Sequence, residues 1–291
     1  MENQETLRTC QLEMLDILQE FCRICEKHNL KYWLDAGTLL GSIRHRGFIP
    51  WDDDIDVGML REDYEKFLEV AENELQEQYL IQKPFSNVNA FTKIRKKNTL
   101  MLERYDANYH QGIFLDIFPM DTYSKNNFKF KLFERRYHLM YKLILFKEHS
   151  LKESGLSIKN LIKSCIKLPL LLVGALNREN LDKYIKMNSK RIIEETKKNT
   201  PFRVAYGVEI YVFPEVHRYE DIFPLSTAEF EGVEFTIPHN YDSYLKDCYG
   251  DTYMELPPEG QRIWHNEKIL LNLTEEEEEE FNIKNDFAKL K

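Results

Sequence analysis

Four aspartates fall within five consecutive positions of this chain, at Asp52, Asp53, Asp54 and Asp56. Asp54 and Asp56 alternate with two apolar residues, which is the period-two pattern of a half-buried strand. Alternate strand residues share a face, so this pattern holds two carboxylates about 6.5 Å apart beside a core. Like charges in that position need a compensating cation, and Mg²⁺ is the ion that oxygen ligands usually recruit. The run therefore predicts a metal-dependent phosphoryl-transfer site.

A glycine turn precedes the aspartates and leads into a predicted short helix over residues 39–46. At such a turn, Gly37 permits close approach of a ligand, and the N–H groups at the start of the helix favour an anion. The Thr38 hydroxyl adds a hydrogen-bond donor. Arg44 and His45 lie on the same helix and could reach the same anion, although surface residues at a helix end are an equally good interpretation.

A further carboxylate, Asp116, lies in a predicted strand over residues 113–118 and shares its face with two phenylalanines. An isolated carboxylate in such a poorly solvated place needs a metal ion or a basic partner. An ordinary salt bridge to Lys93 or Arg95 is the alternative to a metal ligand. Together with the alternating pair, Asp116 completes the three carboxylates of a nucleotidyltransferase-like palm.

The hydrophobic periodicity predicts helices and strands in one chain, and the three carboxylates after a glycine turn indicate the kind of sheet. Together they predict an α+β fold, with a nucleotidyltransferase-like mixed sheet flanked by helices and a helical insertion in the middle of the chain. Helices are expected over residues 6–28 and 61–78, and strands over 32–34, 54–57, 91–95, 113–118, 204–213 and 233–237. We expect a catalytic core over residues 1–124, a basic and apolar insertion over 125–199, and a C-terminal part over 200–291. This last part should pack back on the core and end in an acidic tail.

Composition narrows the function classes. A formal net charge of −9 argues against nucleic acid as a partner, and five scattered cysteines suggest no disulfide framework. The N-terminal residues lack the apolar core of a signal peptide, so a cytoplasmic location is expected. Residues 125–167 nevertheless carry eleven Lys and Arg against three Glu. This segment is expected either to contact an anionic membrane at its inner face or to form helices whose lysines are merely solvated.

Two other functions compete with phospho-group transfer onto an acceptor. A nucleotidyltransferase, which attaches a nucleoside monophosphate to a sugar or another small acceptor, would use the same three carboxylates. A non-catalytic, membrane-associated metal module is the second rival. As a calcium loop beginning at Asp52, however, the chain has Val57 where glycine is required and Asp63 where glutamate is required.

Two long segments closely resemble the LicD family of phosphocholine transferases, which includes fukutin and fukutin-related protein. The first comprises residues 34–41 and 44–57, with the sequences LDAGTLLG and RHRGFIPWDDDIDV. The second lies between residues 237 and 265 and includes a Tyr-Gly-Asp sequence at 249–251 and the pair Arg262 and His265.

The resemblance implies a transferase that moves a phospho-alcohol from a CDP-alcohol donor onto a hydroxyl of a glycan or lipid-linked glycan, with release of CMP. CDP-choline is the expected donor, and ribitol is the alcohol in related members. Teichoic acid and lipopolysaccharide precursors are the acceptor types that the resemblance implies. Mg²⁺ is the expected cofactor, with Mn²⁺ as an alternative.

By position, the resemblance makes Asp54 and Asp56 metal ligands and Asp116 the third carboxylate and candidate base. It also makes Gly37 and Thr38 the phosphate turn. Asp52 shares the face of the metal ligands and is expected to join them, whereas Asp53 faces away and is expected to be structural. Arg262 and His265 are candidate contacts to the donor diphosphate, or folding contacts to the catalytic core. A choline donor would also need an aromatic cage, which the sequence does not single out.

Overall fold

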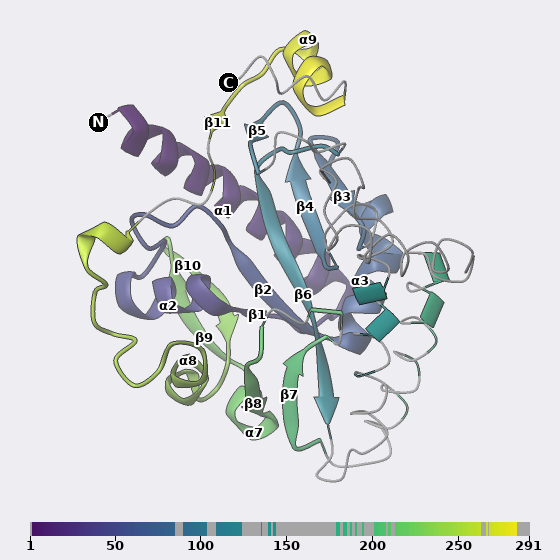
Figure 1. Ribbon diagram of the computed structural model, residues 1–291, viewed down its shortest axis with the longest axis vertical. Helices are drawn as coiled ribbons and strands as arrows, with labels where there is room; N and C mark the ends of the chain where they lie inside the picture. The colour runs from purple at the N-terminus through teal and green to yellow at the C-terminus, as the bar shows by residue number, and fades with distance from the viewer. Residues whose placement is uncertain are drawn as a thin grey trace, which may run out of the picture.

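The computed structural model describes residues 2–84, 90–103, 109–123, 201–207, 209–210, 213–262, 266 and 268–283, with a few further residues between 135 and 194. Over these ranges the chain builds a mixed sheet with helices packed against it, as the α+β prediction requires (Figure 1). The insertion predicted over residues 125–199 lies almost entirely outside the described residues.

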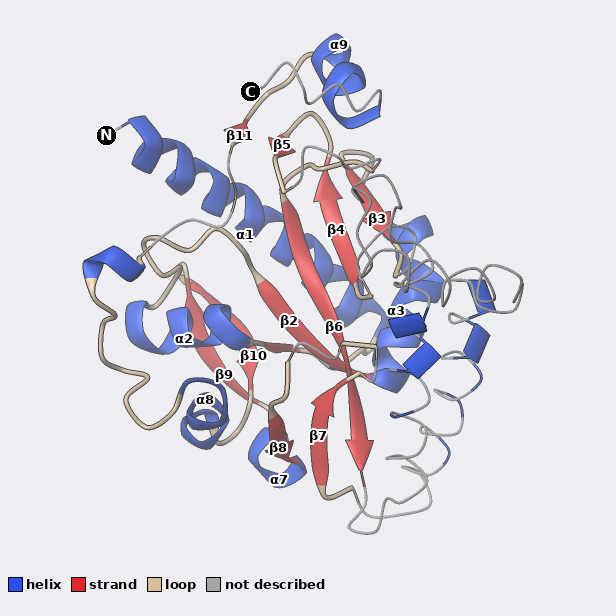
Figure 2. Cartoon of the chain, in the orientation of Figure 1, coloured by secondary structure: helices blue, strands red, loops and turns tan. Residues whose placement is uncertain are grey.

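The central sheet has the strand order β1-β2-β6-β4-β3, and β7 and β8 extend it along the far half of β6 (Figure 2). Strands β2 and β6 run parallel, whereas the other described pairs of this sheet are antiparallel. The strands are β1 (Trp33–Leu34), β2 (Asp56–Leu60), β3 (Tyr79–Gln82), β4 (Thr92–Lys96), β6 (Phe114–Tyr123), β7 (Arg203–Tyr206) and β8 (Val216–Arg218).

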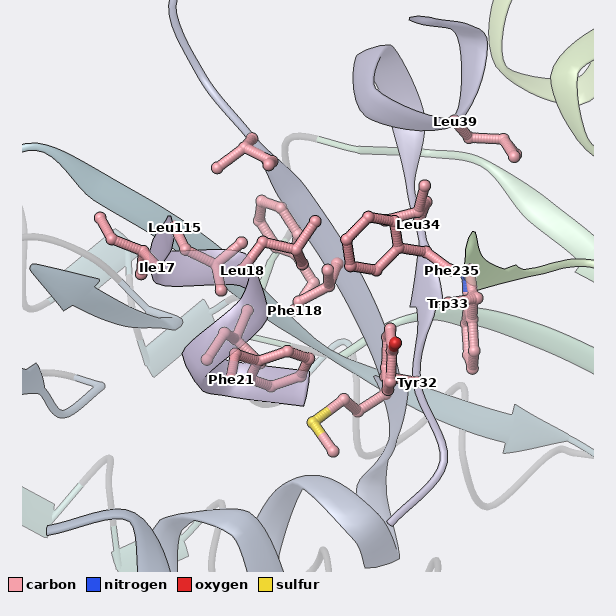
Figure 3. Close-up of a cluster of buried hydrophobic side chains, with 14 of the residues drawn as sticks. Ile17, Leu18, Phe21, Tyr32, Trp33, Leu34, Leu39, Leu115, Phe118 and Phe235 are labelled. Atoms are coloured by element: carbon pink, nitrogen blue, oxygen red, sulfur yellow. The ribbon is translucent and has the colours of Figure 1, made fainter. Parts of the chain in front are cut away.

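The long helix α1 (Glu2–His28) packs its apolar stripe against one face of this sheet. Figure 3 shows Ile17, Leu18 and Phe21 of this helix beside Leu115 of β6. All four side chains are fully buried. At about 25 cal/mol per Å² of apolar surface, burial of this stripe is the main force that holds α1 to the sheet.

Helix α3 (Arg61–Glu74) covers a neighbouring part of the sheet, where the Tyr64 hydroxyl lies 2.7 Å from the Thr92 hydroxyl of β4. The helix ends before residue 78, the predicted boundary. The chain becomes extended at Leu75, because the next N–H group donates to the buried carboxylate of Glu20.

Helix α2 (Ala36–His45) carries the first motif, and both of its ends differ from the predicted helix over residues 39–46. The helix begins three residues earlier because the Asp35 carboxylate caps it by accepting a hydrogen bond from its first N–H group. It ends at His45, because the next residue, Arg46, adopts the left-handed conformation with φ of 57°. Gly47, which was predicted to stop the helix, follows Arg46.

Strand β2 begins at Asp56 rather than at Asp54, so the predicted strand over 54–57 is wrong at its start. Strand pairing starts where the neighbouring chain segments supply hydrogen-bond partners. On the β6 side, the Asp116 N–H donates to the Ile55 carbonyl at 2.9 Å. Asp54 lies in the irregular segment that leads into the strand.

The C-terminal residues return to the core beside α2 and β1 (Figure 1). A two-stranded hairpin packs there, and helix α8 lies against α2. The elements of this region are α7 (Tyr219–Ile222), β9 (Ser226–Phe230), β10 (Val233–Ile237), α8 (Tyr241–Tyr249) and a short 3₁₀ helix (Glu259–Gln261). Farther along the chain, β11 (Ile269–Leu270) pairs with β5 (Leu100–Met101).

The run of glutamates near the C-terminus forms helix α9 (Glu275–Glu278), which a π-helical turn (Glu279–Ile283) follows. Thr274 caps the helix with a capping box. The Glu278 carboxylate of α9 lies 2.8 Å from the imidazole of His110, so this helix contacts the loop before β6.

Candidate active site

Parallel pairing of β2 and β6 places Asp56 and Asp116 directly opposite each other. Across β6, the antiparallel strand β4 places Lys93 opposite Asp116. Two carboxylates and an ammonium group therefore form a row on one face of the sheet. All three residues are less than 9% exposed.

Lys93 is the basic partner of Asp116, as the alternative interpretation of the sequence allowed. Its ammonium nitrogen lies 3.0 Å from Oδ2 and 2.8 Å from Oδ1 of Asp116, and 3.2 Å from a carboxylate oxygen of Glu103. Arg95 ion-pairs with Glu103 instead, at 2.5 Å. Among the described residues, Asp116 Oδ1 has no partner with hydrogen-bond geometry.

Helix α2 is fastened to the start of β2 through Thr38, whose hydroxyl accepts a hydrogen bond from the Asp56 N–H at 2.8 Å. The Asp35 N–H donates to the Asp56 carbonyl at 3.0 Å. Thr38 is 4% exposed. The Thr38 hydroxyl, which was predicted to bind a phosphate, therefore fixes the backbone of Asp56, a candidate metal ligand.

Gly37 lies in the first turn of α2, where the chain approaches the Asp52 carboxylate closely. A Cβ atom at position 37 would lie 2.9 Å from Asp52 Oδ2, and 3.9 Å from the Tyr249 hydroxyl. A side chain at position 37 would force the carboxylate to move. The positive φ of this turn belongs to Ala36, at 42°, so close approach rather than backbone conformation explains the glycine.

Mutual repulsion and burial raise the pKa values of the clustered carboxyls. For Asp56, burial is the largest cause, followed by the charges of Asp54 and Asp116, and its pKa lies well above the usual value. Burial, the charge of Asp54 and a hydrogen bond with the Asp54 carboxyl raise the pKa of Asp52 to about 8. Burial raises the pKa of Asp116 to about 6, although Lys93 lowers it.

Asp53 makes structural contacts, although it lies before β2 and outside the strand alternation from which that role was predicted. Its side chain is fully buried, and Oδ2 accepts hydrogen bonds from both the backbone and side-chain N–H groups of Asn266, at 2.8 and 2.9 Å. It therefore ties the first motif to the C-terminal segment.

Basic and aromatic side chains gather on the Asp52 side of the carboxylates. Arg44 donates to the carbonyls of residues 253 and 255, and its Nε donates to His45 Nε2 at 3.0 Å. The Arg262 guanidinium lies 4.9 Å from the centre of the Trp51 ring, and its Nε donates to the carbonyl of residue 257. Burial lowers the pKa of Arg44, the charge of Asp52 raises it and the charge of Arg262 lowers it, so these three side chains lie in one electrostatic neighbourhood. His265 lies outside the described residues.

The sequence reasoning missed a buried network around Asp35. This carboxylate is fully buried and accepts hydrogen bonds from the hydroxyls of Tyr206 at 2.9 Å and Tyr244 at 2.6 Å. The His217 ring stacks on Tyr244, with 3.6 Å between ring centres. The position of Asp35 just before the glycine turn of the first motif is the only local sequence feature that could have indicated its role.

The donor set suits a hard divalent cation, because several buried carboxylates repel one another and carboxylate oxygens are the ligands that Mg²⁺ prefers. As arranged, however, no group of three or more His, Cys, Asp or Glu side chains in the described part of the chain gathers as a metal shell. Asp116 is paired with Lys93 and Asp52 is hydrogen-bonded to Asp54. Binding of a cation would have to replace these contacts.

No described helix is long and apolar enough to cross a membrane. The basic segment over residues 125–167 falls largely among residues that the structure does not describe, so its predicted membrane contact stays a prediction.

A mixed sheet with a capped helix before a carboxylate pair, and a third carboxylate on the neighbouring parallel strand, is the arrangement expected of the nucleotidyltransferase-like class. The family model described as "LicD/FKTN/FKRP, nucleotidyltransferase domain" matches residues 29–158.

Curated relatives agree with this family. The lipopolysaccharide cholinephosphotransferase LicD of Haemophilus influenzae is 30% identical over 267 residues, which cover 90% of this chain and 96% of the relative. The human ribitol 5-phosphate transferase FKRP is 48% identical over 40 residues, or 14% of this chain and 8% of that protein. The chain belongs to the LicD/FKTN/FKRP family.

Proposed function

We propose that this protein is a Mg²⁺-dependent transferase that moves phosphocholine from CDP-choline onto a hydroxyl of a cell-surface glycan precursor and releases CMP. The observation that carries the proposal is the buried pairing of Asp56 with Asp116. It occurs in a chain that aligns with 96% of a lipopolysaccharide cholinephosphotransferase. A lipopolysaccharide-type acceptor is therefore favoured over teichoic acid.

Asp54, Asp56 and Asp116, joined by Asp52, would hold the Mg²⁺ or Mn²⁺ ion. Such an ion would neutralise the charge that develops on the phosphate oxygens and on departing CMP. The carboxylate of Asp116 is the candidate base for the acceptor hydroxyl. Burial raises its pKa to about 6 although Lys93 lowers it, so this carboxyl is a stronger proton acceptor than an ordinary aspartate.

The donor diphosphate would lie on the Asp52 side, between the first turn of α2 and the basic side chains. The N–H groups of Gly37 and Thr38 favour an anion by their position at a helix start. Arg44, His45 and Arg262 would supply further donors and positive charge.

Transfer of a nucleoside monophosphate is the second candidate, because the matching family model is a nucleotidyltransferase domain. A thermal-stability panel separates the two functions without knowledge of the acceptor. The ligands are CDP-choline, CDP-ribitol, CDP-glycerol, UTP and ATP, each with Mg²⁺ and with a chelator.

We expect a Mg²⁺-dependent stabilisation by CDP-choline, of about 2.7 kcal/mol at one hundred times the Kd. The Asp56→Asn variant should lose the Mg²⁺ dependence. Stabilisation by triphosphates alone would contradict phospho-alcohol transfer and support nucleotidyl transfer.

We also propose that the enzyme works at the inner face of the membrane, where residues 125–167 contact anionic lipid. The excess of positive charge in that segment supports the proposal. The protein should sediment with phosphatidylglycerol vesicles at low salt and be released by added salt. Equal recovery with neutral and anionic vesicles would contradict the contact.

A further inference from the structure

Three aromatic rings pack together on the carboxylate face of the sheet, beyond Asp116 along β6. Phe118 of β6, Tyr206 of β7 and Phe213 lie with ring centres 5.0 to 5.8 Å apart, and we call them the aromatic cluster. Phe118 and Tyr206 are buried, whereas Phe213 is 41% exposed. The cluster therefore presents one accessible ring backed by two rigid ones.

Strand register places the aromatic cluster next to the candidate metal ligands. Phe118 follows Asp116 by two residues on β6, so their side chains share a face about 6.5 Å apart. The hydroxyl of Tyr206 donates to Asp35, whose own N–H is bonded to the carbonyl of Asp56. A group linked to a phosphate at Asp56 and Asp116 would thus lie within reach of these rings.

The charges around the aromatic cluster favour a cation. The Asp35 carboxyl lies at the edge of the cluster, because the Tyr206 hydroxyl donates to it at 2.9 Å. The neighbouring Lys93 is balanced by two carboxylates, Asp116 and Glu103.

The second neighbouring cation, the buried guanidinium of Arg61, is likewise balanced by Asp121 and Glu209. The basic groups of Arg44 and Arg262 lie instead on the Asp52 side, together with Trp51. The two ends of the carboxylate cluster therefore differ in electrostatic character.

We infer that the aromatic cluster is the subsite for the quaternary ammonium group of the donor, with Phe213 as the ring that it contacts. A trimethylammonium group is attracted by aromatic faces and by nearby carboxylates, whereas the guanidinium groups of Arg44 and Arg262 attract the anionic nucleotide end of the donor. The donor would accordingly lie with its choline over Phe213 and its nucleotide toward Arg44. This inference rests on the proposed function and adds to it the choice of alcohol.

The test is equilibrium binding of CDP-choline, CDP-ethanolamine, CDP-ribitol and CMP to the full-length protein with Mg²⁺, measured by titration calorimetry. The variants are Phe213→Leu, which keeps the apolar volume but removes the ring, and Phe213→Tyr, which restores a ring. Phe202→Leu is the matched control, because Phe202 is a similarly exposed phenylalanine, at 37%, near the same sheet.

Phe213→Leu should weaken CDP-choline binding about tenfold and leave CMP binding unchanged, while Phe213→Tyr and Phe202→Leu bind like the wild type. The wild type should also prefer CDP-choline to CDP-ethanolamine, and this preference should shrink in Phe213→Leu. Unchanged CMP binding shows in the same experiment that the variant is folded.

Equal CDP-choline affinity in Phe213→Leu and the wild type would overturn the subsite but leave the proposed function intact. An equal loss of CMP and CDP-choline binding would also overturn it. Wild-type binding of CDP-ribitol but not CDP-choline would overturn both the subsite and the choline assignment. Failure of the wild type to bind any CDP-alcohol would overturn the proposed function itself.

Discussion

Asp56 and Asp116 are register partners on β2 and β6, the parallel pair of the described central sheet. Sixty residues separate them in sequence, yet the backbone fixes their relative position. The Asp116 N–H donates to the carbonyl of Ile55, and the Asp35 N–H donates to the carbonyl of Asp56. Because backbone hydrogen bonds already hold the two carboxylates together, a reaction at this site loses little entropy in bringing them into position.

Replacement of Asp56 by asparagine should abolish turnover without loss of folding. The change removes one of several buried, repelling carboxylates, so the melting temperature should equal or exceed that of the wild type. Activity should fall more than about 100-fold, since even outer partners of metal ligands cost up to that much. CMP release and thermal unfolding measure the two effects.

Asp53→Ala, in the same motif, should behave differently from Asp56→Asn because its main effect is a loss of stability. It removes the acceptor of two hydrogen bonds from Asn266 and should cost about 1–3 kcal/mol of stability. Near-wild-type activity in Asp56→Asn would remove that residue from the candidate site.

Lys93→Met should destabilise the protein by about 3–5 kcal/mol near neutral pH, because it leaves the buried Asp116 carboxylate without its cation. The double variant Lys93→Met with Asp116→Asn should recover most of this loss. Urea unfolding of the single and double variants measures the coupling. As a control, Lys66→Met changes an exposed ion pair and should cost less than about 1 kcal/mol. If the effects of the two buried substitutions on the free energy of unfolding are additive, Lys93 and Asp116 are not energetically coupled.

In the presence of a chelator, the carboxylate cluster should make stability fall as pH rises from about 4 to 8. The pKa values of Asp52 and Asp116 are raised, to about 8 and about 6, above the unfolded value of about 4. A carboxyl with a raised folded pKa contributes stability that is fully present below the unfolded pKa and is lost as pH passes the folded pKa. Mg²⁺ should oppose the loss, because it binds the ionised form.

Melting temperature across this pH range, with Mg²⁺ and with chelator, tests the linkage. Asp52→Asn should flatten the pH dependence, whereas Glu69→Gln, at an exposed position on α3, should leave it unchanged. A profile for Asp52→Asn that parallels the wild type would contradict the assignment of the pH effect to this cluster.

Tyr244→Phe should lower stability by about 1–3 kcal/mol, because the buried Asp35 carboxylate loses a donor at 2.6 Å and Trp33 loses its acceptor. Turnover should also fall in the folded protein, since Asp35 caps α2 and fixes the start of β2. Tyr253→Phe, whose hydroxyl bonds to exposed Asp242, serves as the control. Equal effects of the two variants would indicate that Asp35 has no special role.

Local pattern predicted those features that depend on which face a residue occupies. The alternation of Asp116 with two phenylalanines predicted a poorly solvated carboxylate, and its side chain is 10% exposed. The same pattern placed Lys93 and Arg95 on one face but could not choose between them. That choice depends on strand register, which puts Lys93 opposite Asp116 and Arg95 opposite Phe114.

Contacts between residues far apart in the chain could not be predicted from local sequence pattern. The two tyrosines that hold Asp35 lie 171 and 209 residues away in the chain, so no periodicity could link them to the motif. The start of β2 at Asp56 was missed for a related reason. Strand alternation extends back to Asp54, but the ladder begins only where β1 and β6 supply partners.

The most direct test is the position of isotope after slow donor hydrolysis in ¹⁸O-labelled water, with CDP-choline, Mg²⁺ and stoichiometric enzyme. Phospho-alcohol transfer requires attack at the phosphorus that carries choline, so mass spectrometry should find ¹⁸O in phosphocholine and unlabelled CMP. The reaction should need Mg²⁺ and be absent in Asp56→Asn. Appearance of ¹⁸O in CMP would mean attack at the nucleotide phosphorus and would contradict the account.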